Sequence, residues 1–287
     1  MKLGYYPGCC MESTGQAFGK STEKVLEALG VSLEEINDWN CCGSTPAHQA
    51  DHLLSLALSA RNLVQASEQG LDKITAPCAA CYNHLKAAEV EFESHADEIN
   101  EVLEKPHKGD VSVYNLLEVL IELVGMDKVK ERVSNPLKGL KVAPFYGCLL
   151  TRPAKVTNFD HPTNPQSMDN LLEVLGADVV QWGAKTDCCG AGYSLTGTEI
   201  VLKHCGNILE EAKGVGADVI AVACPLCQLN LDTRQSEVEK ELGRKLNMPV
   251  VYITELLGLS LGLPKSELAL GKRLVSSKPI LKKRKVI

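Results

Sequence analysis

The sequence predicts an α/β fold of two pseudo-symmetric lobes, each a small parallel sheet with flanking helices. Three observations lead to this prediction. The same order of cysteines occurs twice in the 287-residue chain. Each copy lies within the same succession of short apolar runs and helical stretches, as in a duplicated unit. The apolar runs are continuous rather than alternating, which is typical of parallel strands buried on both faces.

The repeated pattern uses ten of the twelve cysteines. In each copy, a single cysteine precedes a Cys-Cys-Gly element, which precedes a Cys-x-x-Cys element. The first copy comprises Cys9, Cys41, Cys42, Cys78 and Cys81. The second comprises Cys148, Cys188, Cys189, Cys224 and Cys227. Five thiols offered twice indicate two thiolate-bound cofactors rather than scattered packing residues.

The first half begins with a strand that ends just before Gly8-Cys9. The elements expected there are a strand over 2–6, a helix over 48–69, a strand over 72–76, a helix over 82–92, a loop over 106–110 and an amphipathic helix over 114–125 packed between the lobes. Gly70 closes the first helix in the manner of a C-terminal glycine. Trp39 lies just upstream of the first Cys-Cys-Gly element.

The second half repeats this order, and Trp182 takes the place of Trp39. The elements expected there are a strand over 141–146, a helix over 199–213, a strand over 218–223 and a helix over 228–242. Right-handed crossovers gather the cysteines at the carboxyl edge of each Rossmann-like sheet. We expect a first lobe over 1–135, a second over 136–265 and a basic tail over 266–287.

The tail carries a basic run over 281–285. Such a run is typical of a solvated terminus. The alternative is a strip that docks an acidic surface of a partner.

Composition narrows the class of protein. Hydrophobic residues make up 45% of the chain, which is enough for a core, and the net charge of −6 argues against a nucleic-acid partner. No secretory signal and no uninterrupted apolar span of about 18 residues occurs. We therefore expect a cytoplasmic protein, in whose reducing surroundings cysteines serve metal or redox chemistry rather than disulfides.

Three cofactors compete for the cysteines. Zinc and a cubane 4Fe–4S cluster each take four ligands, which leaves one thiol spare in each copy. A more open iron–sulfur cluster uses all five. Both Cys-x-x-Cys elements stand at expected helix starts, which favour an anionic core, and Gly43, Gly190 and Gly192 allow close backbone approach. A cofactor-free cysteine core or a thioredoxin-type dithiol explains less of the pattern. Cys10 and Cys205 fall outside it, and we expect both to be packing residues.

The ten cysteines resemble the paired cysteine-rich CCG domains of the heterodisulfide reductase B-subunit family, over residues 1 to about 260. The resemblance implies two noncubane 4Fe–4S clusters, each bound by the five cysteines of one copy. It implies reduction of a low-molecular-weight disulfide, in methanogens the mixed disulfide of coenzyme M and coenzyme B. The alternative is an electron-transfer subunit that serves a quinone or a partner dehydrogenase without a disulfide of its own.

The chain carries neither a ferredoxin-type cysteine run nor a Gly-x-Gly-x-x-Gly fingerprint for flavin or nicotinamide. In the family, electrons arrive through a ferredoxin-like C subunit, which a flavin-containing A subunit supplies. The resemblance therefore implies partners of both types, together with a small-molecule disulfide.

The segment after Cys148 offers candidate substrate residues. Arg152 or Lys155 would pair with an anionic group of the disulfide, and His161 would relay protons. The alternatives are solvated charges and a turn histidine. The sequence departs from the methanogen subunits at Leu149, where they usually carry a histidine. We expect structural roles for the helical histidines His48, His52, His84 and His204.

Overall fold

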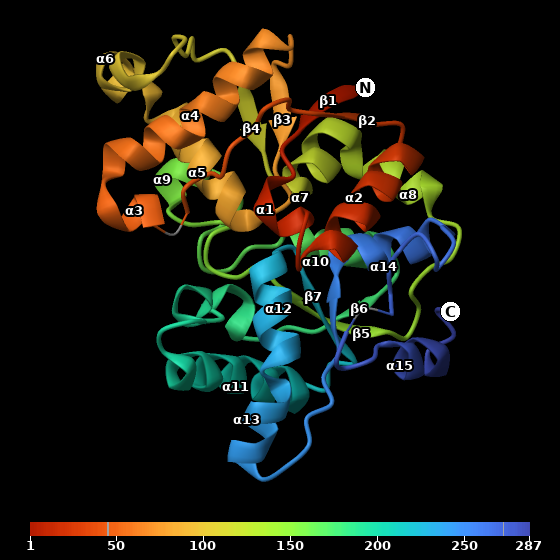
Figure 1. The fold of residues 1–287 in the computed structure, drawn as a ribbon. Helices are drawn as coiled ribbons and strands as arrows, with labels where there is room; N and C mark the ends of the chain where they lie inside the picture. The colour runs from red at the N-terminus through yellow and green to blue at the C-terminus, as the bar shows by residue number, and fades with distance from the viewer. Residues whose placement is uncertain (45, 272) are drawn as a thin grey trace.

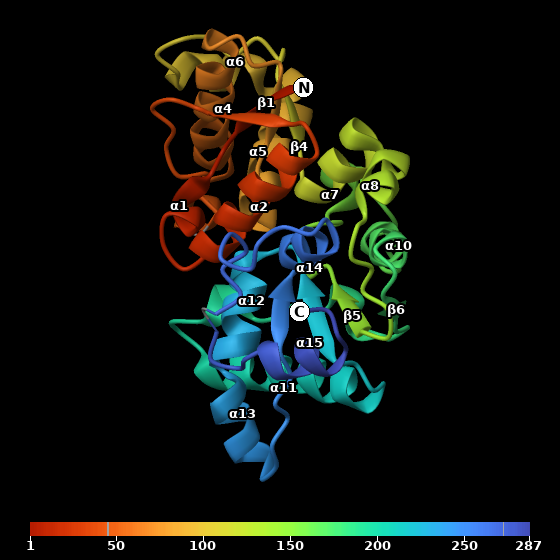
Figure 2. The ribbon, with the colours of Figure 1, turned by 90° about the vertical axis from the view of Figure 1, so that its right-hand side faces the viewer.

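The computed structural model describes residues 1–44, 46–271 and 273–287 of the chain. It contains two four-stranded, fully parallel sheets, one in each half (Figure 1). This confirms the predicted α/β fold. Figures 1 and 2 show the two halves stacked on each other, with the N-terminal half above the C-terminal half.

The first sheet has the strand order β2-β1-β3-β4. Its strands are β1 (Lys2–Tyr5), β2 (Ser32–Glu35), β3 (Lys73–Thr75) and β4 (Ser112–Tyr114). The helices of this half are α1 (Gly8–Met11), α2 (Gln16–Ala28), α3 (Pro46–Ala50), α4 (His52–Glu68), α5 (Ala79–Val90), α6 (Phe92–Val102), α7 (Leu116–Glu118), the π-helix η1 (Val119–Gly125) and α8 (Met126–Arg132).

The second sheet repeats the topology, with the order β6-β5-β7-β8. Its strands are β5 (Lys141–Phe145), β6 (Asp178–Val179), β7 (Val219–Val222) and β8 (Val250–Tyr252). Its helices are α9 (Ala154–Thr157), α10 (Ser167–Val174), the 3-10 helices η2 (Ala184–Thr186) and η3 (Ala191–Tyr193), α11 (Thr198–Gly214), α12 (Pro225–Thr233), α13 (Gln235–Leu242), α14 (Ile253–Ser260) and α15 (Lys278–Lys283).

The strand order places the cysteines. In each sheet, the first three strands along the chain are neighbours and parallel, and a cysteine element follows each of them. The carboxyl ends of parallel neighbours lie at one edge of the sheet. Each sheet therefore delivers its five thiols to one edge, while β4 and β8 run into helices without a cysteine.

Three expected helices have different bounds. The helix expected over 48–69 is two helices, because the Asp51 side chain caps α4 by accepting a hydrogen bond from Leu54 N at 2.8 Å. The helix expected over 228–242 is interrupted at Arg234, between α12 and α13. The helix expected over 114–125 begins later, because Tyr114 ends strand β4 and Asn115 forms a capping box with Glu118.

The basic run of the tail is exposed at Lys282, Lys283 and Lys285, as expected of a solvated terminus, but neighbouring residues fix it to the second half. Leu281 and Val286 are buried in the hydrophobic core. The Arg284 guanidinium binds Asp218, with Nε to Oδ2 at 2.8 Å, and Asn135 Nδ2 donates to the carbonyl of Val286. Apolar residues on either side of the basic ones thus fix α15 onto the second half. The exact boundaries of the lobes and the tail stay predictions.

The two halves share one continuous core. At their junction, α14 lies against α2 (Figure 1), and Ser21 Oγ and Thr254 Oγ1 share a buried hydrogen bond of 2.6 Å. The rings of Phe18 and Tyr252 stack with centroids 4.5 Å apart. Among the described residues, none of the helices has the length and apolar character needed to cross a bilayer. The apolar stretch that includes α14 is part of the protein core instead.

Candidate functional site

The five cysteines of each half occupy equivalent positions. Cys9 follows β1, the Cys-Cys pair follows β2, and Cys78 is the N-cap residue of α5. In the second half, Cys148 follows β5 and Cys224 is the N-cap residue of α12. Within each set, three thiols are buried and the remaining two are more accessible. The buried ones are Cys42, Cys78 and Cys81 in the first set, and Cys189, Cys224 and Cys227 in the second.

Sulfur distances repeat as well. Cys42 Sγ lies 3.5 Å from Cys81 Sγ, and Cys189 Sγ lies 3.6 Å from Cys227 Sγ. The amide of the following glycine points at the exposed thiol of each pair. Gly43 N lies 3.5 Å from Cys41 Sγ, and Gly190 N lies 3.4 Å from Cys188 Sγ. The repeated sequence has therefore built the same thiol arrangement twice.

Glycines hold the backbone close to the sulfurs. A Cβ atom at Gly8 would lie 3.0 Å from Cys81 Sγ, and one at Gly147 would lie 3.0 Å from Cys227 Sγ. Both glycines have positive φ, 61° and 70°. Any other residue would meet the sulfur and strain the backbone. These two glycines keep space free beside one thiol of each Cys-x-x-Cys element.

The aromatic support is repeated too. Trp39 packs edge-on against Tyr6, with ring centroids 5.6 Å apart. Trp182 packs against Phe145 at 6.1 Å. Tyr6 and Phe145 each stand three residues before the first cysteine of their set. The two tryptophans thus tie the segment before each Cys-Cys pair to the strand that carries the first cysteine.

Hydrogen bonds between neighbouring thiols shift their pKa values. Hydrogen bonding with Cys41, and then with Cys81, lowers the pKa of Cys42 to about 3. Hydrogen bonding with Cys148, and to a smaller extent the charges of His204 and Arg152, lowers the pKa of Cys188 to about 6. Each set therefore holds a thiolate at neutral pH, the form of cysteine that binds metals.

The two sets meet where the halves join. Hydrogen bonding with Cys10, and then with Cys224, raises the pKa of Cys78. Hydrogen bonding with Cys227, and then with Cys78, lowers the pKa of Cys224. Cys10 of α1 also lies next to Cys78. A Cβ atom at Gly15, after α1, would lie 3.1 Å from Pro225 Cβ, so this segment abuts the second Cys-x-x-Cys element.

The sequence predicts that Cys10 is a packing residue. It is buried, as expected of a packing residue, but its thiol adjoins a thiol of the repeated pattern. The signal in the sequence was its place directly after Cys9, which repeats the adjacency of the Cys-Cys pairs. Cys205 does behave as a packing residue, since it is fully buried and its thiol donates to the carbonyl of Cys189 at 3.5 Å.

The donor set fits one of the competing cofactors better than the others. All twelve cysteines are free thiols. Sulfurs around one tetrahedral zinc ion lie about 3.8 Å apart. Across the described residues, no three cysteine sulfurs lie within 4.8 Å of one another. The sulfurs therefore surround more space than one ion fills. Iron–sulfur clusters fit this arrangement better, because all donors are sulfur, glycines leave space beside them and two helices begin there.

Arg152 is the one candidate substrate residue that the described contacts bring to a thiol set. Its Nε donates to the carbonyl of Cys148 at 3.4 Å, and a second guanidinium nitrogen donates to the carbonyl of Thr186. Asn83 of α5 holds the same loop from the other half, donating to the carbonyl of Arg152 at 2.8 Å. Asn83 had no signal in the sequence, because its role depends on contact between the halves.

Lys155 and His161 lie in other surroundings. Lys155 lines a cavity of about 520 Å³ together with Lys86, Glu89 and Glu118, and no cysteine lines that cavity. His161 Nδ1 accepts hydrogen bonds from the amides of Thr163 and Asn164, at 3.3 and 3.0 Å. These are the contacts of a turn histidine. Substrate roles for Lys155 and His161 stay predictions.

The four helical histidines lie in two different environments. The charge of His84 contributes to the low pKa of Cys42, and that of His204 to the low pKa of Cys188, so both stand near thiols. The ring of His48 packs against His84, with centroids 5.2 Å apart. His52 lies in different company, beside Glu91 and His95.

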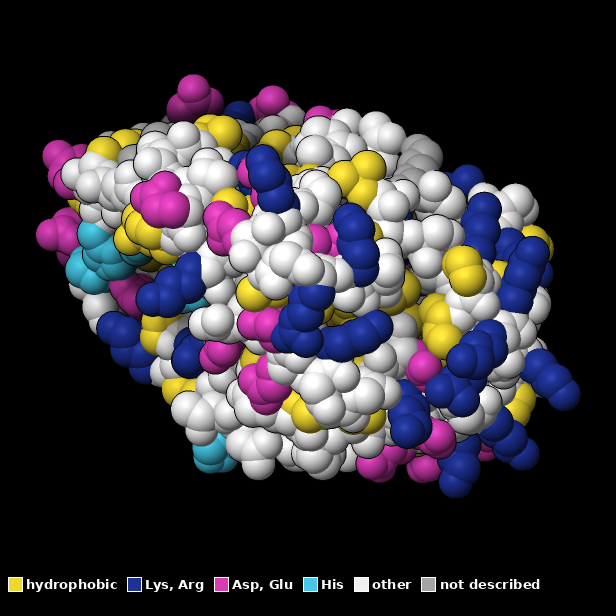
Figure 3. All heavy atoms as spheres, turned by 90° about the horizontal axis from the view of Figure 1, so that it is seen from below, with side chains coloured by type: hydrophobic (Ala, Val, Ile, Leu, Met, Phe, Trp, Pro, Cys, Tyr) yellow, Lys and Arg dark blue, Asp and Glu magenta, His cyan; other side chains and the backbone are white. Residues whose placement is uncertain are grey.

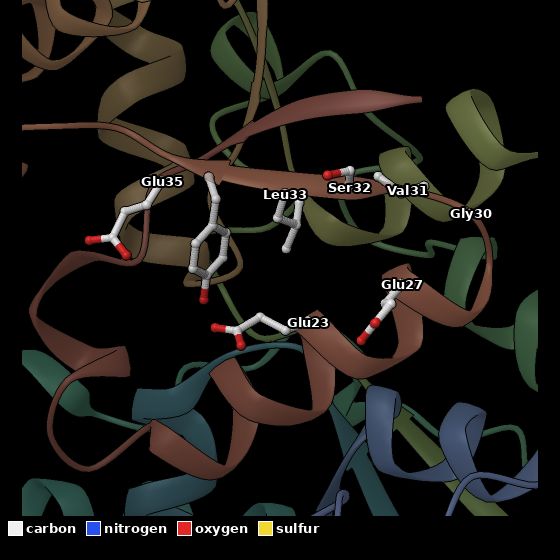
Figure 4. Close-up of a pocket in the computed structure, with 8 residues that line it drawn as sticks. Glu23, Glu27, Gly30, Val31, Ser32, Leu33 and Glu35 are labelled. Carbon is white, nitrogen blue, oxygen red and sulfur yellow. The ribbon is translucent and has the colours of Figure 1, made fainter.

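A separate cavity of about 550 Å³ lies between α2 and β2 (Figure 4). Glu23, Glu27 and Glu35 line it, and no cysteine does. Burial, followed by the charge of Glu35, raises the pKa of Glu23. The acidic lining distinguishes this cavity from the thiol sets.

Two parallel sheets that each bring five thiols to one edge define a redox protein of the iron–sulfur class. The family model described as "CCG: Cysteine-rich domain" matches residues 3–86 and 142–232. The chain belongs to this family of cysteine-rich CCG-domain proteins. Both matched segments end just beyond a Cys-x-x-Cys element, so each contains one complete thiol set.

Similar proteins carry names that refer to different reactions. The chain is 35% identical to the 8-methylmenaquinol:fumarate reductase membrane anchor subunit of Wolinella succinogenes, over 96% of this chain and 98% of that one. It is 31% identical to the B subunit of the ferredoxin/F420H2-dependent CoB–CoM heterodisulfide reductase of Methanosarcina acetivorans, over 98% and 96%. It is 25% identical to lactate utilization protein A of Oceanobacillus iheyensis, over 90% and 96%.

A solved structure of a hypothetical protein from Helicobacter pylori has the same fold. The TM-score is 0.76 at 15% sequence identity, with 96% of this chain and 52% of that chain covered. The chain thus spans about half the length of that protein. This likeness supports the fold alone.

Proposed function

We propose that the ten repeated cysteines hold two noncubane 4Fe–4S clusters, one in each half. We further propose that the chain is the catalytic member of a heterodisulfide reductase-like complex that reduces a low-molecular-weight disulfide to two thiols. The observation that carries the proposal is the duplicated thiol arrangement, with Cys42 Sγ 3.5 Å from Cys81 Sγ and Cys189 Sγ 3.6 Å from Cys227 Sγ. Two such sets provide for two clusters, each of which supplies electrons singly.

Cleavage of a disulfide needs this kind of pairing. One disulfide takes up two electrons and two protons and gives two thiols. Two one-electron carriers beside one substrate supply both electrons without releasing a radical. Relatives named as B subunits of heterodisulfide reductases, at 31% and 30% identity over 98% of the chain, support the same reaction.

The chain's own residues have separate tasks in this proposal. The three buried cysteines of each set anchor the cofactor, and the exposed Cys9, Cys41 and Cys188 mark the accessible side of the sets. Arg152 holds the loop after Cys148 and places a positive charge beside Cys188. That charge favours an anionic disulfide such as one carrying sulfonate or phosphate.

The Wolinella relative favours a second function, because its name specifies a quinol and fumarate. At 35% identity, this relative is more similar to the chain than the Methanosarcina acetivorans B subunit, which is 31% identical. In this function, the chain passes electrons between a quinone and a partner dehydrogenase and has no disulfide of its own. Leu149 agrees with it, because the histidine usual in the methanogen subunits is missing. Both functions require partners, for which we propose a ferredoxin-like C-type subunit and a flavin-containing A-type subunit.

Iron, acid-labile sulfide and zinc are measured first on anaerobically purified protein. We expect about eight iron and eight sulfide per chain with negligible zinc. Cys42→Ser and Cys189→Ser should each lower the iron content by about half, because each removes one buried ligand from one set. About four iron with one zinc would contradict the paired-cluster proposal.

The holoprotein is then reduced and mixed with either coenzyme M–coenzyme B heterodisulfide or a menaquinone analogue. Release of two thiols per disulfide, with reoxidation of the reduced clusters, supports disulfide reduction. Oxidation by the quinone alone supports the second function. Arg152→Ala should slow the disulfide reaction at least tenfold. Lys155→Ala, in the neighbouring helix α9, is the comparison: a similar loss would show that Lys155 also serves the substrate.

A further inference from the structure

We propose that His52, Glu91 and His95 form a binding site for a divalent transition-metal ion such as Zn²⁺, separate from the thiol sets. The ligating atoms of these three side chains all lie within 4.8 Å of one another. No other group of three or more histidine, cysteine, aspartate or glutamate side chains in the described part of the chain meets this condition.

The three residues come from three elements that meet at a corner. His52 is the first residue of α4, and Glu91 ends α5. His95 lies in α6 at a non-helical position, with φ −130° and ψ 16°. The turn from α5 into α6 and the kink at His95 bring side chains of α5 and α6 together above the start of α4. The site is therefore a product of the fold rather than of sequence spacing.

The three side chains are already close enough to share one cation. His52 Nε2 lies 2.9 Å from Glu91 Oε2, and the rings of His52 and His95 stand at 78° with centroids 6.0 Å apart. Donors around a tetrahedral zinc ion lie about 3.3 Å apart. Small side-chain movements are enough to close the three donors on one ion.

Glu98 supports the site from outside. Its Oε2 lies 2.9 Å from His95 Nδ1. A histidine that donates Nδ1–H to a carboxylate presents the lone pair of Nε2 to a metal, an arrangement common around protein-bound zinc. His95 therefore has a partner that sets its tautomer for ligation.

Exposure gives an ion access. The side chain of His52 is 58% exposed, that of His95 34% and that of Glu91 21%. Figure 3 shows histidine side chains gathered at one edge of the molecule, with acidic side chains close by. Two imidazoles and one carboxylate suit zinc and its neighbours better than magnesium or calcium. Three protein ligands leave a fourth position for water.

The neighbouring pair of His48 and His84 provides a matched control. Its rings are 5.2 Å apart, closer than those of His52 and His95, but no carboxylate among the described residues completes a three-ligand group there. If paired histidines alone captured the ion, both places would bind it. On our proposal only the His52 group does.

The test uses anaerobic holoprotein with its iron in place, so that the thiols are occupied. Crystals soaked in ZnCl₂ are measured on both sides of the zinc absorption edge, which separates zinc from iron. We expect one anomalous peak among His52, Glu91 and His95. Its absence at millimolar zinc, or a peak that persists in His52→Ala, would overturn the proposal.

Solution measurements test the same site. Titration of holoprotein with ZnCl₂ should give one site per chain and raise the melting temperature without changing the iron–sulfur absorbance. His52→Ala and His95→Ala should weaken binding at least tenfold, and His48→Ala should leave it unchanged. Equal affinity in the wild type and in His52→Ala would refute the assignment, even if both proteins bind zinc.

Discussion

At the scale of single residues, equivalent positions in the two halves show which features the thiol sets require. Ser59 Oγ donates to the carbonyl of Cys42 at 3.1 Å, and the Cys205 thiol donates to the carbonyl of Cys189 at 3.5 Å. The halves thus use a hydroxyl and a thiol for the same contact. Cys205 therefore belongs to the support of the second set and not to its ligands.

This equivalence predicts that Cys205→Ser is tolerated. A serine hydroxyl keeps the hydrogen bond to the Cys189 carbonyl, so the free energy of unfolding should fall by no more than about 1.5 kcal/mol. The iron content should stay that of the wild type. Chemical denaturation and iron analysis measure both, and Cys189→Ser, which removes a proposed ligand, is the contrasting variant. Loss of iron in Cys205→Ser would make Cys205 a ligand.

Glu118 is a residue whose charge opposes folding. Burial raises its pKa from 4.5 to about 7, although the amide of Asn115 and the charge of Lys86 act against the shift. Between these two pH values, the folded protein keeps a proton that the unfolded chain releases. The free energy of unfolding therefore decreases as the pH rises through this range, by about 3 kcal/mol in total.

Glu118→Gln should remove this pH dependence. The glutamine oxygen still accepts the hydrogen bond from Asn115 N, which is 2.6 Å long in the wild type. We expect the variant to be more stable than the wild type at pH 8 and no more stable at pH 5. Urea unfolding at both pH values measures the difference. Glu131→Gln removes a charge from an exposed position of α8 and should keep the pH dependence of the wild type.

At the scale of elements, the sequence predicted those that carry cysteines better than those that do not. Strands β1, β3, β5 and β7 were expected within one or two residues, and the helices after Cys78 and Cys224 begin three residues earlier than expected. The short outer strands were not predicted. β6 has only two residues, and β2 reads Ser-Leu-Glu-Glu, so neither has the apolar run that indicates a buried strand.

The site was predictable to the same extent. Adjacent positions in sequence and the parallel-strand rule place the thiols of each half together. Contacts between elements distant in the sequence were not predictable, because Asn83, Cys10 and the corner at His95 depend on how separate elements turn toward one another. The burial of Leu281 was not predicted either, because the tail was interpreted from the charges of its basic run.

The glycine at the end of each first strand gives a prediction for an element. In Gly147→Ala, the new Cβ would lie 3.0 Å from Cys227 Sγ, at a φ of 70°. We expect about half of the iron to be lost, because only the second set is disturbed. Iron analysis, with electron paramagnetic resonance of the remaining cluster, measures the effect.

Gly216→Ala is the matched control. Its φ is 74°, so the backbone strain is similar, but no atom lies within 4 Å of the added Cβ. This variant should lose about 1 kcal/mol of stability and no iron. Equal loss of iron in both variants would show that backbone strain, and not space beside the sulfur, is what matters at Gly147.

At the scale of the whole molecule, the halves form one cooperative unit. The buried pair of Ser21 and Thr254 and the stacked rings of Phe18 and Tyr252 join them. The two Cys-x-x-Cys helices also start beside each other, at Cys78 and Cys224. A shared core of this kind predicts one unfolding transition rather than two.

Phe18→Ala should destabilise both halves together. Phe18 is fully buried, and its removal costs about 3 to 5 kcal/mol. Calorimetry should show one transition at a lower temperature. Tyr252→Phe keeps the stacked rings and removes only a hydroxyl that lies 3.4 Å from Gln228 Oε1, so it should cost about 1 kcal/mol or less. Two separate transitions in Phe18→Ala would show that the halves fold independently.

The core shared by the two halves has a consequence for how reactants reach the thiol sets. Many two-lobed proteins open and close like a jaw, and their reactants enter through the gap. Here one continuous core joins the halves, so we expect no such opening between them. On the proposed function, substrate and partners therefore reach the thiol sets from outside, where Cys9, Cys41 and Cys188 are exposed.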